Sequence, residues 1–271
     1  MSLYINTNIA ASNAQRQLTK STNALGKTYE RLSSGLRINS ASDDAAGLTV
    51  SSRMTAQIRG LNQSARNAND GISLVQVAEG ALAETEAALQ RMRELAVQAA
   101  SGSYNNTDRS DLNDEVTQLV TEITRISTDT KFNGVSLMSS NQTFDIQVGA
   151  DVGQKITVST QGAGASLLGV TTASITSAGL ASIAIGKIDA AIASVSDMRS
   201  VLGAQQNRLE AAITNLSNVS ERTQAARSRI MDADIAQETA NLTKQSILQQ
   251  AGAAMLAQAN QQPQIMLSLL R

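Results

Sequence analysis

The sequence contains no cysteine, no histidine and no tryptophan among its 271 residues. Without cysteine and histidine, the chain cannot form a disulfide, present a thiol nucleophile or an imidazole base, or build an ordinary zinc site. Catalysis by carboxylates alone and calcium binding are the site chemistries that this composition leaves open. Enzymes that depend on a thiol, an imidazole or an ordinary zinc site are therefore excluded.

Aromatic residues make up only 2% of the chain, and there is a single proline. Large rings dominate burial in many globular cores, so a different kind of packing is expected here. The abundant alanine, leucine, isoleucine and glutamine suit long, narrow helical bundles in which helices approach closely. The 22 lysines and arginines nearly balance the 23 aspartates and glutamates, so bulk charge indicates neither nucleic acid nor an acidic membrane as a partner.

Apolar residues at every seventh position predict a helix with a coiled-coil seam over residues 11–36. One set of seam positions is Ala11, Leu18, Leu25 and Leu32, and a second set, offset by four, is Thr22, Tyr29 and Leu36. The helix is expected to end near Gly35 and Asn39, where a cluster of serine and aspartate offers caps for the next helix.

The C-terminal tail, residues 245–270, carries no charged side chain. Its helical apolar stripe is Ile247, Leu248, Ala251, Met255, Ala259 and Met266. An uncharged run of this length could span a membrane, but its many side-chain amides would then lie in hydrocarbon. These amides belong to Gln245, Gln249, Gln250, Gln258, Asn260, Gln261, Gln262 and Gln264. We therefore expect a helix, interrupted near Pro263, whose stripe packs on residues 11–36 and on other protein helices.

Between the two ends, the apolar period changes from helical to alternating and back. Steps of three and four predict a helix over 43–100 and, after a turn at 101–107, a second helix over 108–127 that folds back on it. Alternation over 142–158 predicts a β-hairpin, and Phe132 to Gly134 reads as a turn. Residues 160–182 are expected to be irregular surface, and heptads resume from Ile185.

The predicted fold is mainly α, a long antiparallel helical bundle or coiled coil with a small β-hairpin near the middle of the chain. The layout is nearly mirror-symmetric, so the chain runs out and comes back and its two ends meet. We assign residues 1–43 and 228–271 to the two halves of a terminal coiled coil. Residues 44–184 and 185–227 are assigned to the outgoing and returning parts of a second domain.

Three acidic clusters resemble sites of chemistry but have structural explanations. Asp43 and Asp44, like Asp232 and Asp234, lie where helices are expected to begin, and acidic residues there cap the helix and complement its dipole. NANDG, residues 67–71, lacks the remaining spacing of a calcium loop and is interpreted as a polar contact between helices. We expect no catalytic residue, no metal and no cofactor.

Seven segments resemble bacterial flagellin, in order along the chain. They are RLSSGLRINSASDDAAGL (31–48), GLNQSARNANDGISLVQVAEGAL (60–82), LQRMRELAVQ (89–98), FNGV (132–135), IQVGA (146–150), ARSRIMDADIAQE (226–238) and ANQQPQIMLSLLR (259–271). Only about 35 residues separate IQVGA from the returning helix, so the resemblance is to a short form with almost no outer variable domain.

The resemblance implies a structural subunit that self-assembles into the flagellar filament used for swimming. It also implies secretion to the flagellum without a cleaved signal peptide, with a flagellar export chaperone, the filament cap and hook-associated proteins as partners. No nucleic acid and no membrane span are expected. Two alternatives remain open at this point, a hook–filament junction protein and a secreted helical binding module.

In the family, the terminal helices form the coiled coil between and within subunits, with the C-terminal helix lining a central channel. The residues expected in the subunit-to-subunit coiled coil are Leu18, Leu25, Leu32, Leu36, Ile235, Leu242, Leu248 and Met255. The residues expected to line the channel are Gln249, Gln250 and Gln258.

LQRMRELAVQ is expected to form a contact with other proteins, because it carries a leucine among charges on a helix. The resemblance implies packing between subunits and recognition by the host Toll-like receptor for flagellin, with a solvated face as the plain alternative. The residues concerned are Leu89, Gln90, Arg91, Glu94, Leu95 and, from the folded-back helix, Glu115.

Hydroxyl side chains gather at 157–182, the outermost point of the expected layout. They are candidate O-glycosylation sites on composition alone, and an intact mass of the native protein would test this. The residues are Ser159, Thr160, Ser166, Thr171, Thr172, Ser174, Thr176 and Ser177.

Overall fold

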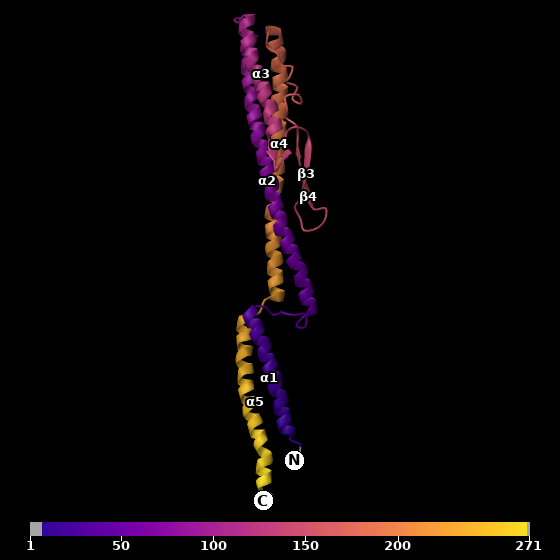
Figure 1. Ribbon diagram of the computed structural model, residues 1–271, viewed down its shortest axis with the longest axis vertical. Helices are drawn as coiled ribbons and strands as arrows, with labels where there is room; N and C mark the ends of the chain where they lie inside the picture. Colours follow the sequence, from indigo (N-terminus) through magenta and orange to yellow (C-terminus); the bar gives the residue numbers. More distant parts are fainter. Residues whose placement is uncertain (1–6, 270–271) are drawn as a thin grey trace. The chain divides into compact units, whose positions relative to one another are not determined.

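A computed structural model describes residues 7–269, with the backbone alone described for 263–269. The chain contains five helices and two β-hairpins within that range (Figure 1). The helices are α1 (Ile9–Ser34), α2 (Ala45–Ala100), α3 (Asn106–Asp129), α4 (Ala178–Met231) and α5 (Ile235–Leu269). The strands are β1 (Lys131–Phe132), β2 (Val135–Ser136), β3 (Gln142–Gln147) and β4 (Lys155–Thr160). The prediction of a mainly α fold is confirmed.

The chain divides into two compact units. The terminal unit comprises Met1–Ala56 and Arg222–Arg271, and the central unit comprises Gln57–Glu221. The boundary expected at 43/44 lies in the break between α1 and α2, whereas the one expected at 227/228 lies within α4, near its end at Met231. The compact units divide within α2 and α4.

The two long helices match their predicted lengths closely at three of their four ends. At 1.5 Å per residue, the 56 residues of α2 extend about 84 Å. The start of α4 is the exception, because it begins at Ala178 rather than at Ile185. Ser177 precedes it, and its Oγ accepts the N–H of Leu180 at 3.3 Å, which is the capping contact that begins the helix.

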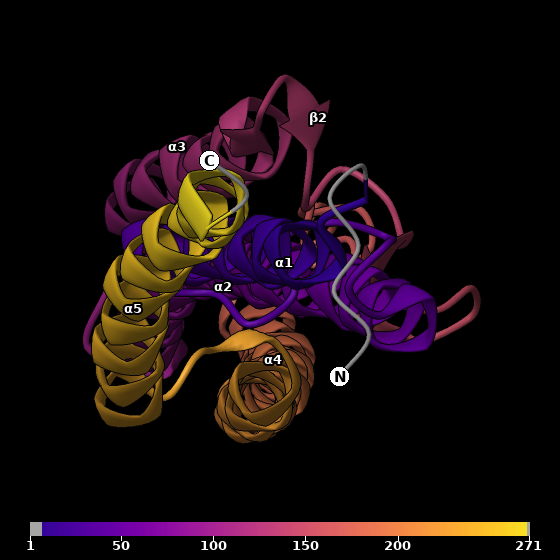
Figure 2. The ribbon, with the colours of Figure 1, turned by 90° about the horizontal axis from the view of Figure 1, so that it is seen from below.

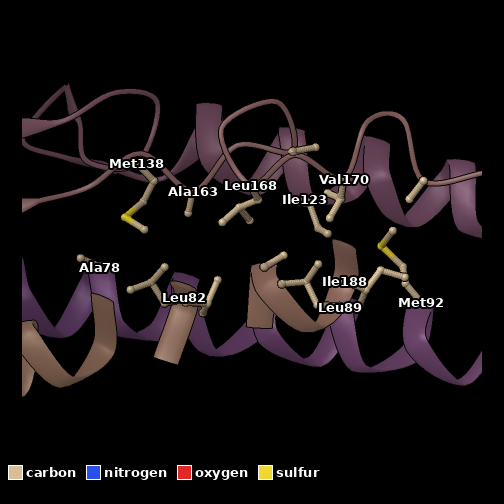
Figure 3. Packing of buried hydrophobic residues seen from close by; sticks show 14 of the residues in the cluster. Ala78, Leu82, Leu89, Met92, Ile123, Met138, Ala163, Leu168, Val170 and Ile188 are labelled. Atoms are coloured by element: carbon tan, nitrogen blue, oxygen red, sulfur yellow. The ribbon is translucent and has the colours of Figure 1, made fainter. Parts of the chain in front are cut away.

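The core of the central unit is built from α2, α3, α4 and the segments between them. On α2 the fully buried residues near its C-terminal end are Leu89, Met92, Leu95, Ala96 and Ala99. In Figure 3, Leu89 and Met92 of α2 and Ile188 of α4 point toward Ile123 and Val170 across the core. The buried stripe on α2 is thus wider than a two-position heptad seam, because more than one element packs against it.

Residues 161–177 are irregular, as expected, but they are not merely surface. Six apolar side chains of this segment are buried and complete the core: Ala163, Ala165, Leu168, Val170, Ala173 and Ile175. The segment is fixed by hydrogen bonds, such as Ala163 N–H to the Met138 carbonyl at 2.9 Å and Ile175 N–H to Asn113 Oδ1 at 3.0 Å. Because these apolar residues recur with no regular period, the sequence pattern did not predict their burial.

Both hairpins are antiparallel and short. The turn expected at Phe132 to Gly134 joins β1 to β2, and Asn133 and Gly134 have φ of 49° and 80°. Positive φ at both central residues is typical of a type I′ turn, for which Asn-Gly is a favoured sequence.

In the second hairpin, Ile146 pairs with Ile156. A Cβ added at Gly71 of α2 would lie 3.2 Å from Ile146 Cγ1 and 3.3 Å from Leu209 Cδ1, so this glycine lets the hairpin and α4 approach α2 closely.

Within the terminal unit, the two breaks between helices pair with each other. Leu36 and Asp232 form an antiparallel bridge. The N–H of Arg37 donates to the Met231 carbonyl at 2.6 Å, and the N–H of Ala233 donates to the Gly35 carbonyl at 2.9 Å. These contacts agree with the prediction that the chain runs out and comes back so that its two ends meet.

Candidate functional site

The terminal unit brings the two ends of the chain together as an antiparallel helix pair. α1 and α5 lie side by side in two perpendicular views (Figures 1 and 2). At one end, Asn8 Nδ2 donates to the Ala259 carbonyl at 2.8 Å. Toward the other end, Arg31 Nη1 lies 3.2 Å from Glu238 Oε1. The tail helix is continuous through position 263, so the interruption expected at Pro263 does not occur.

On α1 the seam follows a heptad, but only one of the two predicted sets lies in it. Leu18, Leu25 and Leu32 are half-buried, as expected. The second set is offset by three rather than four, because Ser21 and Thr28 are 3% and 6% exposed while Tyr29 is 57% exposed. Leu36 lies beyond the end of α1 and joins the bridge to Asp232. Small side chains at the second position allow the helices to approach closely, which a tyrosine there would prevent.

On α5 the residues that face α1 are, apart from Ala259, not those of the apolar stripe. A row of buried and half-buried positions follows steps of four and three: Glu238, Leu242, Gln245, Gln249, Gly252, Leu256 and Ala259. A Cβ added at Gly252 would meet Leu18 Cδ1 at 3.5 Å, an ordinary packing distance. The prediction that the stripe packs on residues 11–36 of the same chain is therefore wrong for Ile247, Leu248, Ala251 and Met255, and the side chain of Met266 lies outside the described residues.

The stripe instead lies on the outside of the helix pair. Ile247, Leu248 and Met255 are 59%, 39% and 61% exposed, and Ile235 at the start of α5 is 50% exposed. Several seam positions on α5 are taken by glutamine, glutamate and glycine, and beside the seam residues Leu242 and Leu256 the other large apolar side chains lie largely exposed. Whether Ile235, Leu248 and Met255 contact a second subunit stays a prediction.

The three glutamines that were expected to line a channel differ in their exposure. Gln249 is half-buried and belongs to the seam with α1, whereas Gln250 and Gln258 are exposed. The assignment of Gln249 to a channel surface is thus contradicted by its place in the seam. Gln250 and Gln258 remain candidates.

Acidic residues at the helix starts act as caps, as their positions predict. Asp44 Oδ1 accepts the N–H of Gly47 at 2.8 Å, and Asp234 Oδ1 accepts the N–H groups of Ala236 and Gln237. Asp232 differs, because it follows the end of α4 and accepts the hydroxyl of Ser228 at 2.6 Å.

Asp43 holds the loop before α2. Its Oδ2 accepts the N–H groups of Asn39 and Ser40 and the hydroxyl of Ser40. Partial burial raises the pKa of Asp43, but these hydrogen bonds and nearby Lys27 outweigh it, so the net pKa lies below its ordinary value. Across the described residues, no three histidine, cysteine or carboxylate side chains come together to hold a metal ion. Asn67 of the NANDG segment donates to the Gln147 carbonyl of β3 at 3.2 Å, so its polar contact is with the hairpin.

Arg91 is the centre of a charged surface on α2 and α3. Its Nε lies 2.9 Å from Glu115 Oε1, and its Nη1 lies 3.0 Å from Glu94 Oε2. Hydrogen bonds to Glu115 and Glu94 raise the pKa of Arg91 above its ordinary value. Of the six residues expected to form a contact with other proteins, the structure thus brings together Arg91, Glu94 and Glu115. Gln90 is exposed beside them.

Leu89 and Leu95 do not belong to that surface. They are 0% and 1% exposed and lie in the core of the central unit, so their assignment as contact residues is wrong. A leucine among charged residues predicted a contact with other proteins at Leu95. α2 buries a wider stripe, and a leucine among charges is here a core residue.

A neighbouring apolar residue was missed. Val97 is 49% exposed and lines a surface hollow with Gln90, Arg93, Glu94 and Gln98. Nearby, Arg93 Nε lies 2.6 Å from Asp189 Oδ1 of α4. The helical period could have predicted the exposure of Val97, because Val97 lies outside the apolar stripe of α2 that contains Ala96 and Ala99.

The hydroxyl side chains of the middle segment divide into two groups. Thr160 is 2% exposed, and Ser159 is half-buried with its Oγ accepting from Gln205 Nε2 at 2.9 Å. Glycosylation of folded Thr160 is therefore contradicted, since its hydroxyl cannot reach an enzyme. Ser174 and Ser177 are half-buried, and the exposed hydroxyls are those of Ser166, Thr171, Thr172 and Thr176.

Both ends of the chain match models of a known protein family. Residues 5–143 match the family model described as the bacterial flagellin N-terminal helical region, and residues 185–270 match that of the C-terminal helical region. The chain belongs to the bacterial flagellin family. The two matched stretches contain α1, α2, α3, most of α4 and α5, so the helical architecture described above is that of a flagellin.

Relatives match this flagellin over nearly its whole length. The flagellin of Halalkalibacterium halodurans is 51% identical, with 99% of this chain and 100% of the relative covered. The flagellin of Bacillus subtilis is 45% identical over the same shares of both chains. A protein of Treponema phagedenis named as a flagellar filament 33 kDa core protein is 44% identical, again over 99% and 100%.

Solved structures agree in fold. The crystal structure of Bacillus cereus flagellin covers 56% of this chain and 88% of its own, at 35% identity and a TM-score of 0.52. A flagellar hook-associated protein from Vibrio parahaemolyticus gives a TM-score of 0.59 at 14% identity, which shows a shared fold alone.

This flagellin is a structural subunit of the flagellar filament, an extracellular appendage used for motility, and it polymerises with itself. Nothing in these comparisons favours the junction-protein alternative. Among the described helices, α4 is long and apolar enough to cross a membrane by composition. Its apolar residues Ala184, Ile188, Val195 and Leu202 are instead buried in the core.

Proposed function

We propose that the exposed stripe of α5, formed by Ile247, Leu248, Ala251 and Met255, is the surface through which the terminal units of neighbouring subunits pack in the filament. The observation that carries the proposal is the exposure of these apolar side chains beside a largely polar intrachain seam. Contiguous exposed apolar residues mark protein contacts. The filament core is then the terminal unit, assembled from many copies.

The absence of cysteine in the native sequence allows a direct test. Ile247→Cys or Met255→Cys introduces a single thiol whose reaction with a maleimide reports its accessibility. We expect rapid labelling in the monomer and protection in the filament. Thr171→Cys, at an exposed position of the irregular segment, is the matched control and is expected to label in both states. Equal labelling of Ile247→Cys in monomer and filament would place the stripe outside the subunit contacts.

Gln250 and Gln258, which are also exposed on α5, are proposed to face a channel in the assembled core. Their amides are exposed, and α5 carries no charge in the described side chains after Lys244. A channel lined by such amides is hydrated, and it binds the unfolded subunits that travel through it only weakly. Gln250→Lys and Gln258→Lys are expected to slow filament growth while leaving the helicity of the monomer unchanged, and unchanged growth would contradict the assignment.

The Arg91 surface is proposed to contact other proteins through Gln90, Arg91, Glu94 and Glu115. These side chains are exposed, and Arg91 forms ion pairs with Glu94 and Glu115. The partners proposed are a neighbouring subunit and the host Toll-like receptor for flagellin. Signalling by purified monomer carrying Arg91→Ala is expected to fall relative to Ser110→Ala, an exposed control on α3, and an undiminished response would count against receptor contact.

The remaining partners follow from the family. We propose that a flagellar export chaperone, the filament cap and hook-associated proteins bind this chain, and that it is exported without a cleaved signal peptide. The exposed stripe of α5 supports a chaperone, since apolar surface needs cover before assembly. An N-terminal sequence that begins at residue 1 or 2 in protein from filaments would support uncleaved export, and a truncated terminus would refute it.

The hydroxyls of Ser166, Thr171, Thr172 and Thr176 are proposed as the accessible O-glycosylation candidates. They are exposed in the irregular segment. An intact mass of native protein equal to that of the unmodified chain would refute this proposal.

A further inference from the structure

The β1–β2 hairpin turns through the only Asn-Gly pair in the sequence, Asn133–Gly134. Both residues are exposed, and their positive φ values identify them as the two central residues of the turn. We propose that Asn133 is a site of spontaneous deamidation and isomerisation, at which the folded chain converts an asparagine to aspartate and isoaspartate. The reaction needs only the folded chain, so it is independent of how subunits assemble.

The position of Gly134 makes its backbone nitrogen an accessible nucleophile. It has no side chain to block approach to the Asn133 amide. The strand pairs are Lys131 with Ser136 and Phe132 with Val135, so the N–H of Gly134 lies outside the ladder. Among the hydrogen bonds of the described residues, none uses this N–H as a donor. An exposed N–H that is not hydrogen-bonded loses its proton to base more readily than one held in a helix or sheet.

A second succinimide-forming pair in the same chain provides a contrast. Asp70–Gly71 has the same sequence chemistry, but it lies inside α2 and Gly71 is buried. In the interior of a helix, the N–H of residue 71 is committed to the carbonyl four residues earlier. Reaction at 71 would require the long helix to open, whereas reaction at 134 requires only movement of a two-residue turn.

The chemistry balances without any oxidant or cofactor. The deprotonated nitrogen of Gly134 attacks Cγ of Asn133, a new N–C bond forms, and the Cγ–Nδ2 bond breaks to release ammonia, which carries away the proton. Water then opens the resulting five-membered imide at one of its two carbonyl carbons, adding OH to that carbon and H to the nitrogen. Opening at Cγ yields aspartate, and opening at the backbone carbonyl yields isoaspartate.

The two products differ in their effect on the hairpin. Aspartate tolerates the left-handed backbone conformation of position 133. Isoaspartate adds one carbon to the main chain of a two-residue turn, which the register of β1 with β2 cannot absorb. Directly after β2, Leu137 and Met138 are 0% and 1% exposed, so a displaced β2 transmits strain into the core.

The test uses purified full-length protein incubated at mildly alkaline pH, followed by peptide mapping with mass spectrometry and an isoaspartate-specific methyltransferase assay. We expect the peptide containing residue 133 to gain the mass of an amide-to-acid exchange and to become a methyl acceptor. No other asparagine should convert to a comparable extent, and no isoaspartate should form at residue 70. Asn133→Gly is the matched variant, since glycine accepts the positive φ and removes the reactive side chain, so its folded protein should lack the product.

A parallel incubation in urea decides the role of the turn. Conversion at 133 in the folded protein at a rate of the same order as in the unfolded chain supports the proposal. Conversion in urea alone, with none in the folded protein, would overturn it, because the turn would then protect the asparagine. Conversion of several other asparagines as fast as residue 133 in the folded state would overturn it as well.

Discussion

Replacing the two most exposed apolar side chains of the α5 stripe tests the assembly surface quantitatively. In Ile247→Ser with Met255→Ser, each substitution removes a large apolar side chain, of which 59% and 61% respectively is exposed in the single chain. Because these residues make few intrachain contacts, we expect the monomer to keep its helix content. The variant should instead polymerise poorly.

The magnitude follows from the surface still available for burial. Full burial of such a side chain is worth about 1.5–3 kcal/mol. Since about three-fifths of each remains exposed, covering both in the filament contributes roughly 2–4 kcal/mol per subunit. At about 1.4 kcal/mol per factor of ten, the critical concentration for growth should rise on the order of 30- to 1,000-fold.

Seeded polymerisation followed by sedimentation measures the critical concentration directly. Asn23→Ser on α1 is the matched control, because it replaces one exposed polar residue of the same helix pair by another. Circular dichroism of both monomers should be indistinguishable from that of the unsubstituted chain. A critical concentration within about twofold of the control, less than about 0.5 kcal/mol, would refute the idea that this stripe is buried between subunits.

Three further outcomes are expected in the central unit. Leu95→Ala should lower the free energy of unfolding by about 2–5 kcal/mol in urea titrations, whereas a loss below about 1 kcal/mol would contradict its burial. Gly71→Val should destabilise the hairpin region, seen as faster amide exchange in β3, because a Cβ there already meets Ile146 at 3.2 Å; unchanged exchange would refute this. A hydrogen bond from Lys155 lowers the pKa of Asp145 below its ordinary value of 3.8. The ionised carboxylate therefore stabilises the fold fully above pH 3.8, and this contribution is lost as the pH falls through the lowered pKa. Asp145→Asn should abolish this part of the acid dependence, and an unaltered acid transition would contradict it.

The long helices were predictable because their apolar period persists over many turns. α2 was expected over 43–100 and is found at Ala45–Ala100, since apolar residues recur at steps of three and four in each successive turn. A short connection and an antiparallel return were likewise sufficient to predict α3. The core segment at 161–177 was not predictable in this way, because its backbone has no period for its buried side chains to follow.

Which face of each helix is buried was harder to derive from the sequence than where the helix lies. On α1, Thr22 and Tyr29 suggested a seam offset by four, but Ser21 and Thr28 are the buried residues. On α2 the buried stripe is wider than the two positions per heptad of a coiled-coil seam, and it includes Leu95. Hydrophobicity identifies the seam only where the partner is known, and close antiparallel packing favours small side chains over large ones.

The same preference explains why the ends of this chain depend on assembly. Beside half-buried leucines, the contact between α1 and α5 includes Ser21, Thr28, Glu238 and Gln245, and burying these polar groups contributes little free energy even when they are hydrogen-bonded. An isolated two-helix pair also lacks the additional burial that stabilises larger bundles. Ile247 and Met255 of α5 lie on the outer face, where another subunit can cover them. We therefore expect much of the free energy that orders the ends to come from neighbouring subunits, which would couple folding of the terminal unit to growth of the filament.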